Sequence, residues 1–132
     1  MIPAAAFIPA SDDYDYTNNG SCGGSLSGNA VFSAPLTFRA QQVRMTRITL
    51  YAYDNGTGDA CVSLYRAEPT EGYESLQGQV CTPDSTAMPQ KVSTGTQFPR
   101  FANTGMQAPY LEVYVSGDAT LYGVAVTYTY TP

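Results

Sequence analysis

The chain has 132 residues and a formal net charge of −5; only 13% of its residues are charged, whereas 43% are hydrophobic. A single domain of this length buries roughly two-thirds of the surface of its unfolded chain, and the hydrophobic share excludes a disordered chain. Because the chain has no histidine and only six Lys or Arg against 11 Asp or Glu, imidazole chemistry is excluded and binding to nucleic acid is not expected.

The N-terminal segment of residues 1–10 is apolar and contains Pro3 and Pro9. It lacks a basic region, so we interpret it as a mature start rather than a signal peptide. Two roles remain open for it. It either pairs within its own domain, beside the C-terminal strand, or it is a donor segment that completes the sheet of a neighbour. The candidate donor residues are Ile2, Ala4, Ala6, Phe7 and Ile8.

Residues 11–29 form the most polar interval of the chain, and we expect a long loop there before a main sandwich of residues 30–132. This loop contains Cys22. An odd cysteine leaves three alternatives: an unreactive thiol, an intermolecular bond between copies, or pairing with Cys61 or Cys81.

Alternation of apolar and polar residues with period 2 dominates the rest of the chain, and no window has a helical period. Clear strands are expected at residues 32–38, 48–53, 62–65, 110–115 and 121–130, and weaker ones at 4–8, 75–81 and 91–98. About eight strands separated by turn residues predict an all-β fold. We expect one domain, residues 1–132, built as a single antiparallel, jelly-roll-like β-sandwich.

A hairpin of residues 61–68 and 74–81, in a register centred on Glu71, matches the apolar faces of its two strands. It sets three pairs opposite each other: Val62 with Val80, Leu64 with Gly78, and Arg66 with Leu76. The same register sets Cys61 opposite Cys81, at a Cα separation of about 4.5–5.5 Å that suits a disulfide. We therefore predict a Cys61–Cys81 bridge.

The turn of residues 54–59 offers oxygen ligands from Asp54, Asn55 and Asp59, and it is the favoured position for calcium if the chain binds any. The alternative is a solvated acidic turn, because the segment lacks EF-hand spacing. A histidine-based triad is impossible, and Glu112 is the only acid within a clear strand. We therefore expect a chain that is not an enzyme and has no cofactor other than calcium.

Tyrosine occurs 11 times and tryptophan not at all. Five tyrosines fall on strand faces opposite the predicted core: Tyr51, Tyr53, Tyr65, Tyr110 and Tyr114. Three interpretations remain open for them. They form a stacking platform for sugars, a contact between subunits, or ordinary cross-strand pairs on a solvated face.

Residues 48–56, 62–66 and 121–128, together with the opening residues 4–9, resemble uncharacterised bacterial surface and phage-associated β-sandwich domains, which are like subunits of extracellular appendages. The resemblance implies a jelly-roll-like fold and a role in display or assembly. No stretch approaches the roughly 18 apolar residues that span a bilayer, and the low Lys and Glu content favours a secreted or cell-surface protein.

From these features we expect a non-enzymatic structural protein whose partners are other copies of the chain, assembled into an extracellular fibre, filament, appendage or particle surface. The alternative is a carbohydrate-binding β-sandwich module that uses its surface tyrosines.

Overall fold

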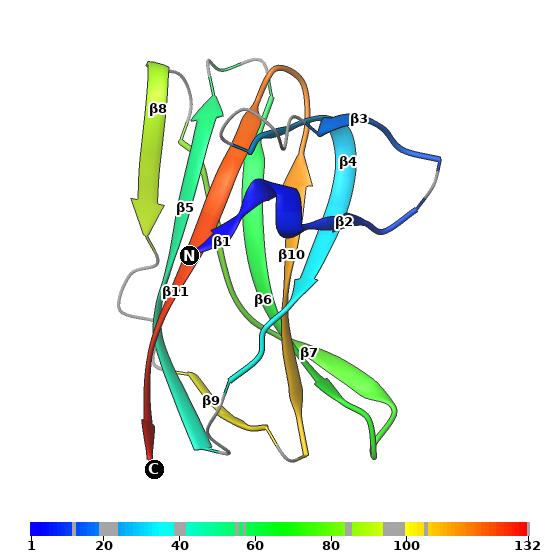
Figure 1. Cartoon of the computed structure of the whole chain (residues 1–132), viewed down its shortest axis with the longest axis vertical. Coiled ribbons are helices and arrows are strands. Elements are labelled where there is room, and N and C mark those ends of the chain that lie inside the picture. Colours follow the sequence, from blue (N-terminus) through cyan, green and yellow to red (C-terminus); the bar gives the residue numbers. More distant parts are fainter. Residues whose placement is uncertain are drawn as a thin grey trace.

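The computed structural model describes residues 1–11, 13–18, 24–38, 42–54, 56, 58–83, 86–93, 100–104 and 106–131 (Figure 1). The elements in chain order are β1 (Ile2–Pro3), the 3₁₀ helix η1 (Ala4–Ala6), β2 (Ile8–Pro9), β3 (Asp15–Asn18), β4 (Leu26–Pro35), β5 (Gln42–Asp54), β6 (Ala60–Glu68), β7 (Tyr73–Cys81), β8 (Thr86–Ser93), β9 (Arg100–Asn103), β10 (Ala108–Val115) and β11 (Thr120–Thr131). This part of the chain contains no helix that is long and apolar enough to cross a membrane.

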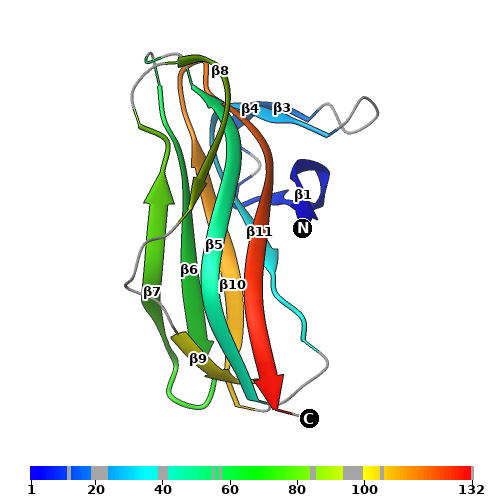
Figure 2. The ribbon, with the colours of Figure 1, turned by 90° about the vertical axis from the view of Figure 1, so that its left-hand side faces the viewer.

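The strands form two antiparallel layers that share β4. The first, here called the β6 layer, has the order β7-β6-β10-β4, and the second, the β5 layer, has the order β4-β11-β5-β8. Residues 30–35 of β4 pair with β10, whereas Leu26 and Ser27 pair with β11. The long strands β5, β6, β10 and β11 run along the longest axis of the molecule (Figures 1 and 2). The predicted all-β, antiparallel, jelly-roll-like sandwich is confirmed.

Inward-facing side chains of both layers form one hydrophobic core. The alternation expected from the sequence places Ile48 and Leu50 of β5 against Val62 and Leu64 of β6, all with no exposed surface. The described residues form eleven strands rather than about eight, because short strands lie at the edges of the long ones.

The segment expected to be a loop, residues 11–29, contains a strand. β3 pairs with β4 from Asp15 opposite Asn29 to Asn18 opposite Leu26, and β4 begins at Leu26 rather than near residue 30. All four residues of β3 are exposed, so the strand has no apolar face that could mark it in the sequence. Cys22 lies outside the described residues.

The N-terminal segment pairs within its own domain and connects the two layers. Ile2 lies opposite Val124 of β11, and Ile8 lies opposite Ser33 of β4. Residues 4–6 form a 3₁₀ turn rather than the strand expected at 4–8.

Of the candidate donor residues, Ala4 and Phe7 are buried in the chain's own core, and Ile2 is packed against it. Ala6 and Ile8 are exposed. Gly123 of β11 admits β1, because a Cβ at this position would lie 3.0 Å from the Ile2 carbonyl oxygen.

The β6–β7 hairpin has most of the predicted register. Cys61 lies opposite Cys81, Val62 opposite Val80 and Leu64 opposite Gly78. The Cys61–Cys81 disulfide is present, with a Cα separation of 4.0 Å.

The predicted pairing of Arg66 with Leu76 is wrong, because a bulge between Leu64 and Tyr65 shifts the register. Beyond it, Arg66 pairs with Ser75 and Tyr65 pairs with Leu76. The bulge therefore places Leu76 on the outer face, where the residue is 55% exposed.

Candidate functional site

The five surface tyrosines do not form one platform. Tyr51 and Tyr53 belong to β5, whereas Tyr65, Tyr110 and Tyr114 belong to β6 and β10. In each strand the tyrosines alternate with residues of the shared core. Because the core lies between the layers, the two groups project from opposite outer faces of the sandwich.

The outer face of the β6 layer gathers aromatic, carboxylate and amide side chains. Its centre is a pair of directly opposed tyrosines, Tyr65 and Tyr110, whose ring centroids lie 5.4 Å apart with planes inclined by 13°. Tyr114 follows along β10 and is 45% exposed. We call this surface the tyrosine face and define it by Ser63, Tyr65, Glu74, Gln79, Tyr110, Glu112 and Tyr114.

Two carboxylates border the stacked rings. The Tyr110 hydroxyl donates a hydrogen bond to Glu74 Oε2. Glu112 lies two residues along β10, directly opposite Ser63 of β6.

Burial is the largest cause that raises the pKa of Tyr110 above its usual value, followed by the hydrogen bond to Glu74 and the charges of Glu74 and Glu112. The pKa of Tyr65 is raised by burial and then by the charges of the same two glutamates. Both phenols therefore stay protonated at neutral pH, next to side chains that accept hydrogen bonds.

The tyrosine face continues into an open hollow of about 380 Å³ at the β6–β7 turn. Its lining residues are Ala67, Glu68, Pro69, Gly72, Tyr73 and Glu74. The Glu68 carboxylate already has partners within the chain, since its Oε1 accepts hydrogen bonds from Arg66 at 3.1 Å and from Gln107 at 3.2 Å. Glu74 contributes both to this hollow and to the stacked pair, so the two features form one continuous surface.

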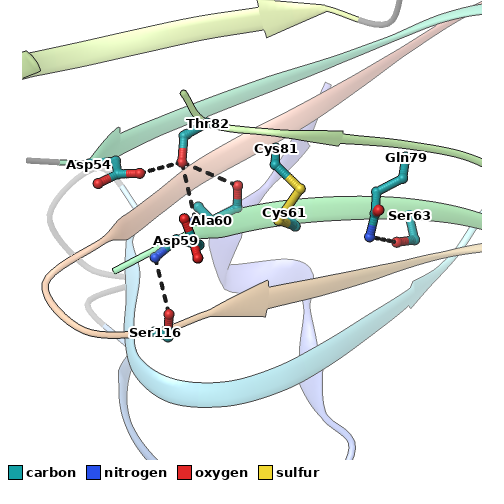
Figure 3. The surroundings of a disulfide bond; sticks show 9 residues. All are labelled: Asp54, Asp59, Ala60, Cys61, Ser63, Gln79, Cys81, Thr82 and Ser116. Carbon is teal, nitrogen blue, oxygen red and sulfur yellow. Dashed lines mark hydrogen bonds between the residues drawn. A yellow bond between two sulfur atoms is a disulfide. The ribbon is translucent and has the colours of Figure 1, made fainter. Parts of the chain in front are cut away.

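Besides their backbone pairing, β6 and β7 are joined by two side-chain connections at the tyrosine face (Figure 3). One is the Cys61–Cys81 disulfide. The other is the hydrogen bond from Gln79 Nε2 to Ser63 Oγ, at 3.0 Å. Tyr114 lies opposite Cys61 on the other side of β6. The disulfide therefore fixes β6, which carries Tyr65, to β7, which carries Glu74, at one end of the face.

Two of the three candidate calcium residues, Asp54 and Asp59, belong to the described part of the chain, and each has its own hydrogen-bond partner. Asp54 is fully buried, and its Oδ2 accepts a hydrogen bond from Thr82 Oγ1 at 2.6 Å (Figure 3). Its Oδ1 accepts one from the Gly56 N–H at 2.7 Å. Asp59 is exposed, and its N–H donates to Ser116 Oγ at 3.0 Å. Asn55 lies outside the described residues.

Within the residues that the structure describes, no group of three or more His, Cys, Asp or Glu side chains could hold a metal ion. The hydrogen bond from Thr82 joins the Asp54 carboxylate, at the end of β5, to the residue that follows β7.

The outer face of the β5 layer has a different character. Lys91 of β8 lies opposite Tyr51 of β5, and its Nζ is 5.9 Å from the centre of the Tyr51 ring. Arg44 and Arg47, both exposed, also belong to β5. Cations therefore accompany the tyrosines of this layer, whereas carboxylates accompany those of the β6 layer.

No protein-family model matches the chain, and neither does any curated protein. Several solved structures share its fold. A family 6 carbohydrate-binding module is 13% identical, with a TM-score of 0.61 over 97% of this chain and 92% of that one. Another module of this family, from Clostridium stercorarium and in complex with cellobiose, is 14% identical, with a TM-score of 0.54 over 96% and 97%.

A third structure is a family 36 carbohydrate-binding module in complex with calcium and xylotriose. It is 10% identical, with a TM-score of 0.52 over 97% of this chain and 98% of that one. At these identities the likeness shows the fold, a jelly-roll β-sandwich.

The interpretation of the chain as a self-assembling fibre, appendage or particle subunit is wrong, because the similar structures are carbohydrate-binding modules. The resemblance to surface and phage-associated domains extends only to the jelly-roll class. The tyrosine-rich, charge-poor strands had suggested contacts between copies, but the tyrosines occupy two separate faces, one of which carries carboxylates beside its rings.

Proposed function

We propose that the chain is a carbohydrate-binding module and that the tyrosine face is its binding site. One observation carries the proposal: the stacked rings of Tyr65 and Tyr110 lie on an outer sheet face with Glu74 and Glu112 beside them. Sugars present apolar C–H surfaces, which pack on aromatic rings, and hydroxyl groups, which donate hydrogen bonds to carboxylates. The cellobiose and xylotriose complexes of the solved neighbours support this assignment.

We expect the chain to bind its glycan without catalysing a reaction on it. Its structural neighbours are binding modules, and its sequence has no histidine. A glycan partner also suits a secreted or cell-surface location. Calcium remains a prediction, supported by the family 36 neighbour that contains it. The binding experiment therefore includes calcium as a variable.

The test measures binding of the purified chain to soluble β-1,4-glucan, β-1,3-glucan and xylan by affinity electrophoresis and isothermal titration calorimetry. Each titration is run with calcium chloride and with a chelator. We expect at least one polysaccharide to bind. Equal affinity with calcium and with chelator would contradict the calcium prediction. If none of the three polysaccharides binds under either condition, the proposed function is contradicted.

Alanine variants locate the site. Loss of a stacking ring is expected to weaken binding by about tenfold, equivalent to about 1.4 kcal/mol, in Tyr65→Ala and in Tyr110→Ala. Tyr110→Phe, which keeps the ring, is expected to retain most of the affinity. The matched control is Tyr51→Ala, a half-buried tyrosine on the opposite outer face. Unchanged affinity in the Tyr65→Ala/Tyr110→Ala double variant would place the site elsewhere.

A further inference from the structure

The tyrosine face carries charge of one sign. Its two charged side chains are Glu74 and Glu112, and their negative charges help to raise the pKa of the Tyr65 and Tyr110 phenols. No described lysine or arginine belongs to the face. The only cation of β6, Arg66, follows Tyr65 in the strand and is held in an ion pair with Glu68 at 2.9 Å. A ligand seated on the rings therefore meets the negative charges of Glu74 and Glu112, whereas Glu68 balances the charge of Arg66.

Cations lie instead on the other layer of the sandwich. Arg44, Arg47 and Lys91 belong to β5 and β8 and are exposed. The five surface tyrosines are thus divided into two surroundings of opposite sign. A ligand that carries carboxylate or sulfate groups is complementary to the β5 layer and is repelled by the tyrosine face.

From this distribution, and resting on the proposed function, we infer that the tyrosine face selects uncharged glycans over acidic ones and that Glu74 and Glu112 produce the selection. A carboxylate only accepts hydrogen bonds, so it pairs with a sugar hydroxyl, which donates one. A uronate or sulfate on the glycan brings further acceptors and a like charge. An acidic glycan therefore forms fewer of these hydrogen bonds, and the two glutamates repel its negative charge.

The expected discrimination follows from Coulomb's law. A like charge held about 6 Å from one glutamate in a water-like medium weakens binding about threefold, and the two glutamates together weaken it about tenfold. Because Glu74 is exposed and Glu112 is half-buried on an outer face, salt screens this effect. The Debye length is about 30 Å at about 10 mM salt and about 3 Å at about 1 M.

The experiment uses the neutral polysaccharide that binds most tightly in the panel described above, in two etherified forms of equal substitution. One form carries neutral hydroxyethyl groups and the other carries carboxymethyl groups, so the two polymers differ in charge but share a backbone. Affinities are measured by isothermal titration calorimetry at low and high salt for the wild-type chain and for Glu74→Gln/Glu112→Gln. The glutamine variant keeps an oxygen that accepts the Tyr110 hydrogen bond.

The matched control is Asp13→Asn/Asp118→Asn, which removes the same charge from two exposed residues outside the tyrosine face. We expect the carboxymethyl polymer to bind the wild type and the control about tenfold more weakly than the hydroxyethyl polymer at low salt. This gap is expected to shrink to about twofold or less at high salt and in the glutamine variant.

Equal affinities for the two polymers in the wild type at low salt would overturn the inference while leaving the proposed function intact. A gap that persists in the glutamine variant, or that closes equally in the control, would overturn it as well, because the selection would then not arise from Glu74 and Glu112. If no neutral polysaccharide binds, both proposals fail.

Discussion

Replacement of the disulfide by alanines, in Cys61→Ala/Cys81→Ala, is expected to lower the free energy of unfolding by about 3 kcal/mol. The two cysteines are 20 residues apart. Closing a loop of this length removes conformational entropy from the unfolded chain that corresponds to about 3 kcal/mol at 25 °C. The substitution itself loses little packing, since Cys61 is half-buried and Cys81 is exposed on the outer face.

The same loss can be expressed as a melting temperature. A chain of 132 residues gains about 0.28 kcal/mol/K of entropy on unfolding, at about 2.1 cal/mol/K per residue. The double variant should therefore melt about 10 °C below the parent. Both proteins are made in a Cys22→Ser background, so that the parent contains a single pair of thiols.

Urea unfolding followed by circular dichroism measures the change, with thiol titration of the unfolded parent to verify that its bridge is closed. Reduced parent protein should match the double variant. A loss below about 1 kcal/mol, with a closed bridge and an unchanged dependence on urea, would refute the entropic reasoning. It would show that the β6–β7 hairpin already restrains the chain in its unfolded state.

Three further predictions concern other parts of the molecule. Phe7→Ala should lower the free energy of unfolding by about 3 kcal/mol, because Phe7 is only 3% exposed. Ile8→Ala should change it by less than about 0.5 kcal/mol, because Ile8 is 64% exposed. Equal melting temperatures of the two variants would mean that the N-terminal segment does not pack as described. Thr82→Val should cost about 2 kcal/mol in urea unfolding because the buried Asp54 carboxylate loses its hydroxyl donor, and Thr82→Ser should restore most of the loss. The fold raises the pKa of the Tyr110 phenol, so the phenol ionises at a lower pH in the unfolded chain than in the folded one. The stabilisation by Tyr110 is therefore fully present below about pH 10 and is lost as the pH rises further. Above about pH 10, the free energy of unfolding should fall more steeply with pH in the wild type than in Tyr110→Phe.

Local patterns predicted the β-sandwich and the disulfide, but they did not predict one bulge that brings Glu74 into the candidate site. In the symmetric register Glu74 pairs with Glu68, on the same face as the core residues Val62 and Leu64. The bulge after Leu64 shifts this pairing by one residue, so that Glu74 lies opposite Ala67 instead. A shift of one residue moves a side chain to the other face of the sheet, and this shift brings Glu74 to Tyr110.

The grouping of the tyrosines failed for a different reason. Alternation within a strand predicts that Tyr51 and Tyr65 point away from the core. It does not predict which layer each strand joins. That assignment depends on strand order, which arises from pairings between distant segments such as β10 with β4 and β11 with β5. Glu112, by contrast, lies between the buried residues Leu111 and Val113, so alternation within its own strand is enough to place it on the outer face.

The pairing of β1 with β11 has a practical consequence for presenting the protein on a surface. β11 is the last described strand, so both ends of the described chain lie in the β5 layer, while the tyrosine face belongs to the other layer (Figure 2). A tag or a fused partner at either terminus is therefore attached on the side opposite the proposed binding face. Immobilised through either end, the chain should present the tyrosine face to the solution rather than to its support.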